Sequence, residues 1–231
     1  MLKKIIPKKY HYKLSNIKNS IIGGYAQVHY SQFGEDIVVS KLLREPHGWY
    51  VDVGAHHPKR YSNTYLLFRR GWQGVNIDAN PHTIQLFDKA RPKDVNIGVG
   101  VGGQDGVLAY HQFSDPAVNT FKEDEARKWM GKKWITYLGA KEVPVRPLRD
   151  ILREVSGLPH IDLLTIDVEG MDLEVLQSND WDTYVPAVII VECSDYTPHA
   201  LSEHPIVSYL RSRGYALEAF VGSSLIFSRH A

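Results

Sequence analysis

Short runs of apolar and β-branched residues recur along the chain, separated by Gly, Pro and Asp. Most are too short to form helices, and they occupy residues 49–53, 74–78, 95–101, 163–168 and 188–193. Apolar runs of this length are typical of strands buried on both faces of a sheet. The pattern therefore predicts five parallel strands in the protein interior.

Segments of helical length, mostly bounded by Gly or Pro, separate these runs. They span residues 63–70, 83–90, 147–155 and 172–177. Strands that alternate with helices connect through right-handed crossovers and build a sheet with helices on both faces. We therefore predict a doubly wound α/β domain.

The C-terminal region follows a different pattern. A predicted helix at residues 205–213 ends before Gly214, and strands at 215–221 and 225–228 are joined by Gly222-Ser223-Ser224. Two strands joined this way form a hairpin, so one strand must run antiparallel to its neighbours. The complete sheet is expected to have seven strands and to be mostly parallel.

Residues 102–144 are less regular than the rest of the chain. They contain a predicted strand at 107–113 and a charged helical segment at 121–129. Their position between the third and fourth core strands suggests a cap or a substrate-facing insertion. The insertion has large side chains at Trp129, Met130 and Trp134. We expect them to pack as core rather than to form a sugar-binding platform.

Length and composition agree with one globular domain. The chain has 231 residues, of which 43% are hydrophobic, enough for a single core. It contains one cysteine, Cys193, so an internal disulfide framework is excluded. No apolar stretch approaches the roughly 18 residues of a membrane span, and no secretory signal pattern begins the chain. We expect a cytoplasmic protein.

Charge divides the chain into a basic arm, residues 1–29, and a main domain, residues 30–231. Residues 1–20 hold six of the 27 basic residues and no acid, which leaves 21 basic against 26 acidic residues in the remainder. The arm is expected to be a solvated leader, or else a peripheral contact to anionic lipid at the inner face of the membrane. The acidic domain makes nucleic acid an unfavourable partner.

Ligands of doubly wound sheets bind beyond the carboxyl ends of the strands. The first run ends with Asp52 and Gly54, and one glycine suits a nucleoside without phosphates better than a dinucleotide, which disfavours an NAD-type oxidoreductase. Asp78 ends the second run, 26 residues after Asp52, where it can hold the hydroxyls of a ribose. The alternative is that Asp78 caps the following helix.

The fourth and fifth runs end in acidic residues. Asp167, Glu169 and Asp172 follow the fourth run, and Glu192 lies at the end of the fifth. Carboxylates gathered at a sheet edge are costly unless they are paired, hydrogen-bonded or bound to a metal, so they indicate a site. For Asp172, capping of the next helix is the favoured interpretation.

In combination, these motifs resemble the FkbM family of methyltransferases. The segments that carry the resemblance are residues 30–36, 50–58 with 62–64, 71–81 and 161–181. The resemblance implies a Rossmann-like class I methyltransferase fold, S-adenosylmethionine as cofactor, and O-methylation of a sugar hydroxyl in a glycan, glycolipid or glycosylated metabolite. A non-sugar small molecule methylated on oxygen or nitrogen is the alternative acceptor.

The resemblance also assigns positions around the cofactor. Gln32, Gly34 and Glu35 would cover its methionine end, although these residues also fit a helix start capped by Ser31. The other cofactor-binding positions implied are Asp52, Gly54, Asn63, Asp78, Ala79, Gly98 and Asp167.

A sugar hydroxyl needs a base or a metal before it can attack a methyl group. In a metal-free mechanism, Glu169 or His56 is the expected base, and Asp167 places the acceptor or the cofactor amine. In the alternative mechanism, Asp167 and Glu192 bind one Mg²⁺, which lowers the pKa of the hydroxyl.

Overall fold

The structure is a computed structural model that describes residue 15, residues 26–193 and residues 201–229. Most of the basic arm, with all of its lysines, therefore lies outside the described residues. Within the described part, none of the helices has the length and apolar character needed to cross a membrane.

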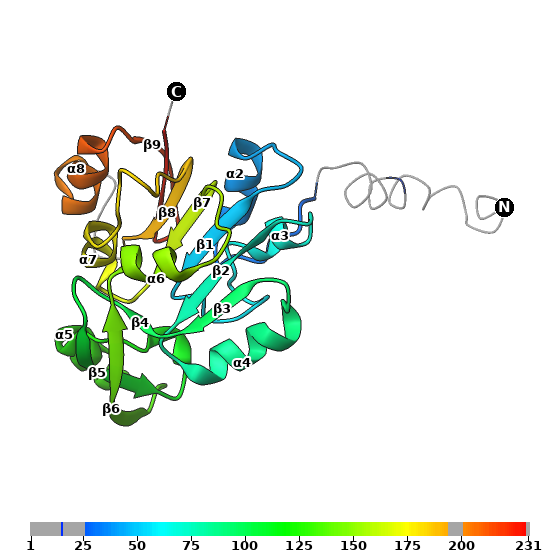
Figure 1. Cartoon of the computed structure of the whole chain (residues 1–231). Helices are drawn as coiled ribbons and strands as arrows, with labels where there is room; N and C mark the ends of the chain where they lie inside the picture. Colours follow the sequence, from blue (N-terminus) through cyan, green and yellow to red (C-terminus); the bar gives the residue numbers. More distant parts are fainter. Residues whose placement is uncertain (1–14, 16–25, 194–200, 230–231) are drawn as a thin grey trace, which may run out of the picture.

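Seven strands form one sheet, in the order β3-β2-β1-β7-β8-β10-β9 (Figure 1). The strand order reverses between β1 and β7, which is where ligands of doubly wound folds bind. The strands are β1 (Trp49–Val53), β2 (Gln73–Asp78), β3 (Val95–Gly98), β7 (Leu163–Ile166), β8 (Val188–Glu192), β9 (Ala216–Val221) and β10 (Ser224–Ser228).

The direction of the strands confirms the predicted architecture. β1, β2, β3, β7 and β8 pair in parallel, whereas β10 is antiparallel to both β8 and β9. This is the seven-stranded, mostly parallel sheet with a C-terminal hairpin of the class I methyltransferase fold.

Successive strand residues face opposite sides of the sheet, so each side has its own core. Val51 and Leu164 belong to the side with α6, α7 and α8, whereas Tyr50 and Leu163 belong to the side with α2 and α3. α4 contacts β2 and β3. The helices are α2 (Glu35–Leu42), α3 (Tyr65–Phe68), α4 (Pro81–Ala90), α6 (Leu148–Glu154), α7 (Asp172–Gln177) and α8 (Pro205–Ser212), and a short 3-10 helix η3 (Leu201–Glu203) precedes α8.

A second sheet forms a separate insertion, with the order β4-β6-β5. The predicted single strand at residues 95–101 was wrong, because β3 ends at Gly98 and Gly100 pairs with Val145 of β6 instead. Its elements are β4 (Gly100–Val101), β5 (Gly106–Phe113), η2 (Pro116–Val118), α5 (Glu123–Met130) and β6 (Tyr137–Arg146). β6 was not predicted, because charged residues and Pro144 interrupt its apolar positions.

The predicted core role of the large side chains in this insertion was wrong for two of the three. Trp134 is 66% exposed and Met130 is 42% exposed, whereas Trp129 is partly buried against a small cluster that includes Phe113. Trp134 lies beyond the end of α5, in the segment before β6.

One buried guanidinium joins the elements around β1. Arg91 is 0% exposed and follows the end of α4. It donates hydrogen bonds to Ser62 Oγ at 2.9 Å, to Thr64 Oγ1 at 2.8 Å and to the carbonyl of Pro58 at 3.0 Å. It also donates to the hydroxyl of Tyr50 at 3.3 Å, and that hydroxyl donates to Asp94.

Replacing Arg91 with Met should lower the free energy of unfolding by about 3 kcal/mol or more, because several buried acceptors lose their donor together. Urea denaturation measures this loss. The matched control is Arg153→Met, since Arg153 is 65% exposed and its ion pair with Asp150 lies at the surface. The control should change stability by less than about 0.5 kcal/mol, and equal losses in the two variants would contradict a structural role for Arg91.

Candidate active site

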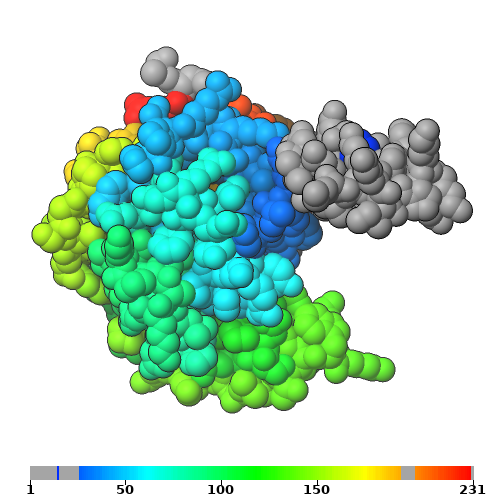
Figure 2. Space-filling view, turned by 90° about the vertical axis from the view of Figure 1, so that its right-hand side faces the viewer, coloured from blue at the N-terminus to red at the C-terminus, as the bar shows by residue number. Residues whose placement is uncertain are grey.

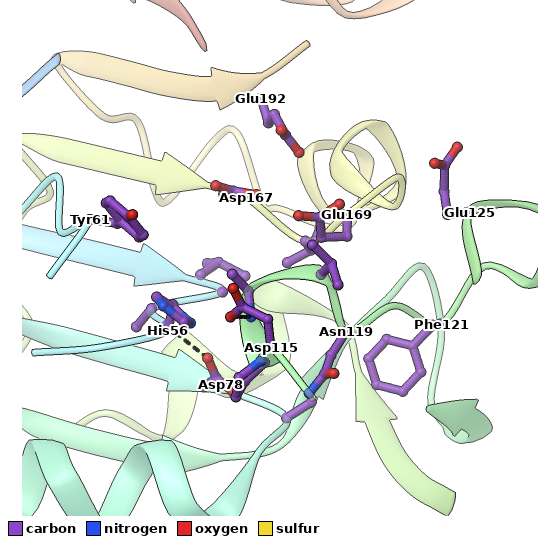
Figure 3. A pocket seen from close by; sticks show the side chains of 18 of the residues that line it. His56, Tyr61, Asp78, Asp115, Asn119, Phe121, Glu125, Asp167, Glu169 and Glu192 are labelled. Atoms are coloured by element: carbon purple, nitrogen blue, oxygen red, sulfur yellow. Dashed lines mark hydrogen bonds between the residues drawn. The ribbon is translucent and has the colours of Figure 1, made fainter. Parts of the chain in front are cut away.

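A cavity of about 650 Å³ lies beyond the carboxyl ends of β1, β2, β7 and β8. Strand-end residues line one side, and residues 115–134 of the insertion line the other (Figure 3). In Figure 2 the insertion, in green, projects below the blue and cyan segments that contain the loop after β1. The cavity thus lies between the main sheet and the insertion.

The turn after β1 requires glycine. Gly54 has φ of +78°, and a Cβ placed on it would lie 1.8 Å from the carbonyl oxygen of Asp167. Any side chain here would separate the ends of β1 and β7. The close approach brings Asp52 and Asp167 to the same part of the cavity wall.

Asp78 lies at the end of β2 and organises two loops. Its carboxylate accepts hydrogen bonds from the backbone amides of His56 at 2.8 Å and Asn80 at 2.7 Å (Figure 3). Burial raises the pKa of Asp78 to about 6, although both amide bonds favour the charged form. Asn80, rather than Asp78, caps α4, because its side chain accepts from His82. The alternative interpretation, in which Asp78 caps α4, is therefore wrong.

Asp52 is connected to the Arg91 network. Thr64 Oγ1 donates to its carboxylate at 2.7 Å, and Arg91 donates to the same Thr64 oxygen. Burial raises the pKa of Asp52 to about 6, while the Thr64 hydrogen bond and the charge of Arg91 act in the opposite direction. The network thus favours the carboxylate form of a buried acid.

Three carboxylates meet at the ends of β7 and β8. Asp167, Glu169 and Glu192 each offer an oxygen, and these oxygens lie within 4.8 Å of one another. Figure 3 shows Glu192 pointing from β8 toward the other two. Asp167 is exposed and the two glutamates are half-buried, so the cluster is open to the cavity although protein surrounds it. The predicted pair for a metal, Asp167 and Glu192, is brought together with Glu169 as a third oxygen donor.

The two glutamates of this cluster hold protons at neutral pH. Burial is the main cause that raises the pKa of Glu169 to about 9, and the charges of Asp167 and Asp172 add to it. Burial and the same neighbours also raise the pKa of Glu192, which shares a hydrogen bond with Asp167. Like charges this close cannot all ionise unless a cation joins them. The cluster is therefore suited to a positively charged ligand.

Asp172 has a structural role. Its carboxylate accepts from the backbone amides of Val168 at 3.2 Å and Gly170 at 3.1 Å, and it holds the loop before α7. The predicted role of Asp172 as helix cap was wrong, because Met171 occupies the N-cap position of α7 without a side-chain cap and Asp172 is the first residue of the helix.

Backbone strain is concentrated at the cavity. His56, Tyr61 and Glu169 are the residues other than glycine with positive φ in the described ranges, and all three line the cavity. Such conformations persist where surrounding contacts impose them, often at functional sites. The His56 ring stacks on Tyr61 at 6.3 Å, and burial, followed by the charge of Arg60, lowers the pKa of His56, so its imidazole is neutral at pH 7.

The remaining predicted cofactor residues divide into two groups. Gln32, Asn63 and Ala79 line the cavity, whereas Gly34, Glu35 and Gly98 do not. Glu35 is buried at the start of α2, where it accepts from Ser224 Oγ at 3.3 Å and from the amide of Phe33 at 2.8 Å. The helix-start interpretation of this segment fits these contacts. Gly34 rather than Ser31 occupies the N-cap position, but Ser31 Oγ accepts from the amides of Gly34 at 3.1 Å and Asp36 at 3.3 Å and so holds the start of the helix.

Several cavity residues were not found by sequence reasoning. Tyr61, Asp115 and Asn119 line the cavity from loops, and Lys128 and Lys132 line it from the insertion. Asp115 precedes Pro116 and accepts from Ala117, so its position resembles an ordinary turn. Loop residues of this kind carry no spacing signal, because the folded chain rather than the sequence brings them together.

The family comparison identifies the enzyme class. A family model described as "Methyltransferase FkbM domain" matches residues 52–217. Similar solved structures include a TehB-like SAM-dependent methyltransferase from Corynebacterium glutamicum, with 12% identity, a TM-score of 0.40, and coverage of 97% of this chain and 100% of that one. A precorrin-6y C5,15-methyltransferase from Geobacter metallireducens has 13% identity, a TM-score of 0.42, and coverage of 85% and 87%. None of the curated proteins matches the chain.

Replacing Thr64 with Val should raise the pKa of Asp52 above about 6, because the hydrogen bond that favours the carboxylate is removed. A carboxyl whose pKa is higher in the folded than in the unfolded protein loses stability as pH rises through that interval. The free energy of unfolding of Thr64→Val should therefore lie below that of the parent by a stability deficit that grows by about 1 kcal/mol between about pH 5 and about pH 8.

The matched control is Thr64→Ser, which keeps the hydroxyl and loses only a methyl group. Its deficit in urea denaturation should be the same at both pH values. A deficit of Thr64→Val that does not change with pH would show that Thr64 has no influence on the ionisation of Asp52.

Proposed function

The chain belongs to the FkbM methyltransferase family, and from this premise we propose that it transfers the methyl group of S-adenosylmethionine to a hydroxyl oxygen of a saccharide. The observation that carries the proposal is the single cavity that joins Asp52 and Asp78, at the positions of a nucleoside site, to the carboxylate cluster around Glu169. A binding site for the methyl donor and a group that can accept a proton therefore face the same space.

The donor groups of the cavity fit this cofactor. Asp78 is positioned to accept hydrogen bonds from ribose hydroxyls, as acids at this strand end do in nucleotide-binding folds. S-adenosylmethionine carries a sulfonium and an ammonium group, and Asp52 and Asp167 offer carboxylates on the same wall. The turn at Gly54 has only one glycine, so the site suits a cationic nucleoside better than a dinucleotide.

Catalysis rests first on placement. When bound, the cofactor supplies an electrophilic methyl group on a positively charged sulfur. Holding an acceptor oxygen in line with that methyl group contributes up to roughly 7 to 11 kcal/mol to lowering the barrier. The oxygen–carbon bond forms while the sulfur–carbon bond breaks, the electron pair stays on sulfur, and the hydroxyl proton passes to a base.

Glu169 is the proposed base. It lies beside Asp167 and next to the insertion (Figure 3). Its pKa of about 9 in the free protein means that it carries a proton at neutral pH. A cationic ligand beside the cluster opposes the charge repulsion that raises this pKa, so Glu169 loses its proton when the cofactor binds and can then accept the proton of the hydroxyl. His56, whose imidazole is neutral, is the alternative base at the other end of the cavity.

A metal-assisted version rests on the same cluster. Asp167, Glu169 and Glu192 offer three oxygens, the kind of ligand that Mg²⁺ prefers. Mg²⁺ at this position would lower the pKa of the acceptor hydroxyl and would itself supply the positive charge that the cluster needs. The two versions differ in whether chelation abolishes turnover.

Calorimetric titration with S-adenosylhomocysteine, with and without EDTA, tests the cofactor. We expect binding at about micromolar concentrations in both conditions, and Asp78→Ala should weaken it at least about tenfold through the loss of charge-assisted hydrogen bonds. Asp105→Ala is the matched control, because Asp105 is 71% exposed and away from the cavity lining. Absence of binding by the parent protein in both conditions would contradict the proposed cofactor, and unchanged affinity of Asp78→Ala would remove Asp78 from the site.

The proton held by Glu169 can be tested without knowledge of the acceptor. Calorimetry in two buffers of different ionisation enthalpy counts the protons released on binding. S-adenosylmethionine should release up to about one proton near pH 7.5, and S-adenosylhomocysteine should release less because its sulfur is neutral. Glu169→Gln should reduce the release while preserving affinity, whereas Glu142→Gln, on the exposed part of β6, should not. Equal proton release by Glu169→Gln and the parent would rule out Glu169 as the proton store.

A further inference from the structure

We propose that the end of the insertion is the acceptor subsite and that it selects an acidic saccharide, with Trp134 contacting the sugar ring and Lys132 pairing with its anionic substituent. This inference rests on the proposed function and identifies the acceptor class for the same cavity. Four features of the insertion support it.

The first feature is an exposed indole in a cavity wall. Trp134 is 66% exposed and lines the cavity together with Trp129. The two rings meet edge to face, with centroids 5.8 Å apart and planes at 80°, so Trp129 supports Trp134 while most of the Trp134 side chain stays exposed. An indole held in this way offers a flat apolar surface, which complements the C–H face of a pyranose ring.

The second feature is the charge at the same end of the insertion. α5 has acids in its first turn and bases in its last, and its ion pairs Glu123–Arg127 and Glu125–Lys128 are both 2.6 Å long. Lys132 lies beyond the helix, two residues before Trp134, and it is exposed and lines the cavity. A cation beside an aromatic surface favours a ring that carries a carboxylate or phosphate.

The third feature is the attachment of the insertion to the loop that carries Glu169. Thr120 Oγ1 donates to the carbonyl oxygen of Glu169 at 2.8 Å, and Lys122 forms an ion pair with Glu174 of α7. A Cβ on Gly170 would lie 3.1 Å from Cγ of Glu125, so α5 packs directly against this loop. A ring bound at Trp134 is therefore held in a fixed relation to the proposed base.

The fourth feature is the internal order of the insertion. His111 and Thr120 exchange two backbone hydrogen bonds, and Asn119 accepts from the amide of Phe113 at 2.8 Å. The ring of Phe121 fills the space over Gly100, where an added Cβ would lie 2.7 Å from it. The part of the insertion that carries the subsite is thus ordered by its own contacts, which reduces the entropy lost on binding.

The test uses the protein loaded with S-adenosylhomocysteine and two probes, 4-nitrophenyl glucuronide and 4-nitrophenyl glucoside, which differ in a carboxylate. Binding is measured by saturation-transfer NMR and calorimetry. We expect the glucuronide to bind about tenfold more tightly than the glucoside, and Lys132→Gln to remove this preference. Trp134→Ala should weaken both probes by about tenfold while leaving the affinity for S-adenosylhomocysteine unchanged.

Neighbouring residues that do not line the cavity provide matched controls. Lys133→Gln and Met130→Ala change the same segment outside the lining and should leave both affinities as in the parent. The subsite is wrong if either control matches its partner variant, or if neither glycoside binds while S-adenosylhomocysteine does. Failure of S-adenosylhomocysteine itself to bind would instead overturn the proposed function.

Discussion

The site depends on the hydrogen bonds of one buried guanidinium. Arg91 follows α4, yet its donors reach the loop after β1 and the start of α3, and through Thr64 they reach Asp52. A buried cation is tolerated only where acceptors surround it, so these backbone and hydroxyl oxygens are held in one arrangement. The wall of the cavity is therefore fixed from behind by a residue that does not line it.

Elsewhere in the cavity wall, carboxylates rather than a buried cation determine the electrostatics. Asp167, Glu169 and Glu192 form a cluster in which burial raises the pKa values, and the charge of Asp167 raises those of the two glutamates further. The fold accommodates these acids by holding the two glutamates protonated, and a positively charged ligand would allow them to ionise. Such a cluster would bind the cationic methyl donor more tightly than the product, whose sulfur is neutral. This difference in affinity would favour release of the product after methyl transfer.

The sequence predicted the main sheet because its strands are apolar runs between Gly, Pro and Asp, and it predicted the acids at the strand ends because parallel strands bring those ends together. The sequence did not predict the parts of the structure that depend on strand pairing or on loop conformation. β6 contains Lys141, Glu142 and Pro144, and its conformation comes from pairing with β5 along nearly its whole length. Thr64 and Arg91 are 27 residues apart and show no shared pattern, and the positive φ of Tyr61 has no signal in the sequence.

The position of β10 has a consequence for synthesis of the chain. Residues 224–228 pair with β8 on one side and β9 on the other, so β10 lies inside the sheet although it follows the other six strands in the chain. Until residues 224–228 have left the ribosome, the backbone donors and acceptors along that side of β8 have no strand to pair with. During this interval the nascent chain carries an open strand edge, which is a template for aggregation. Its yield in a cell should therefore depend on chaperones that cover this edge during elongation.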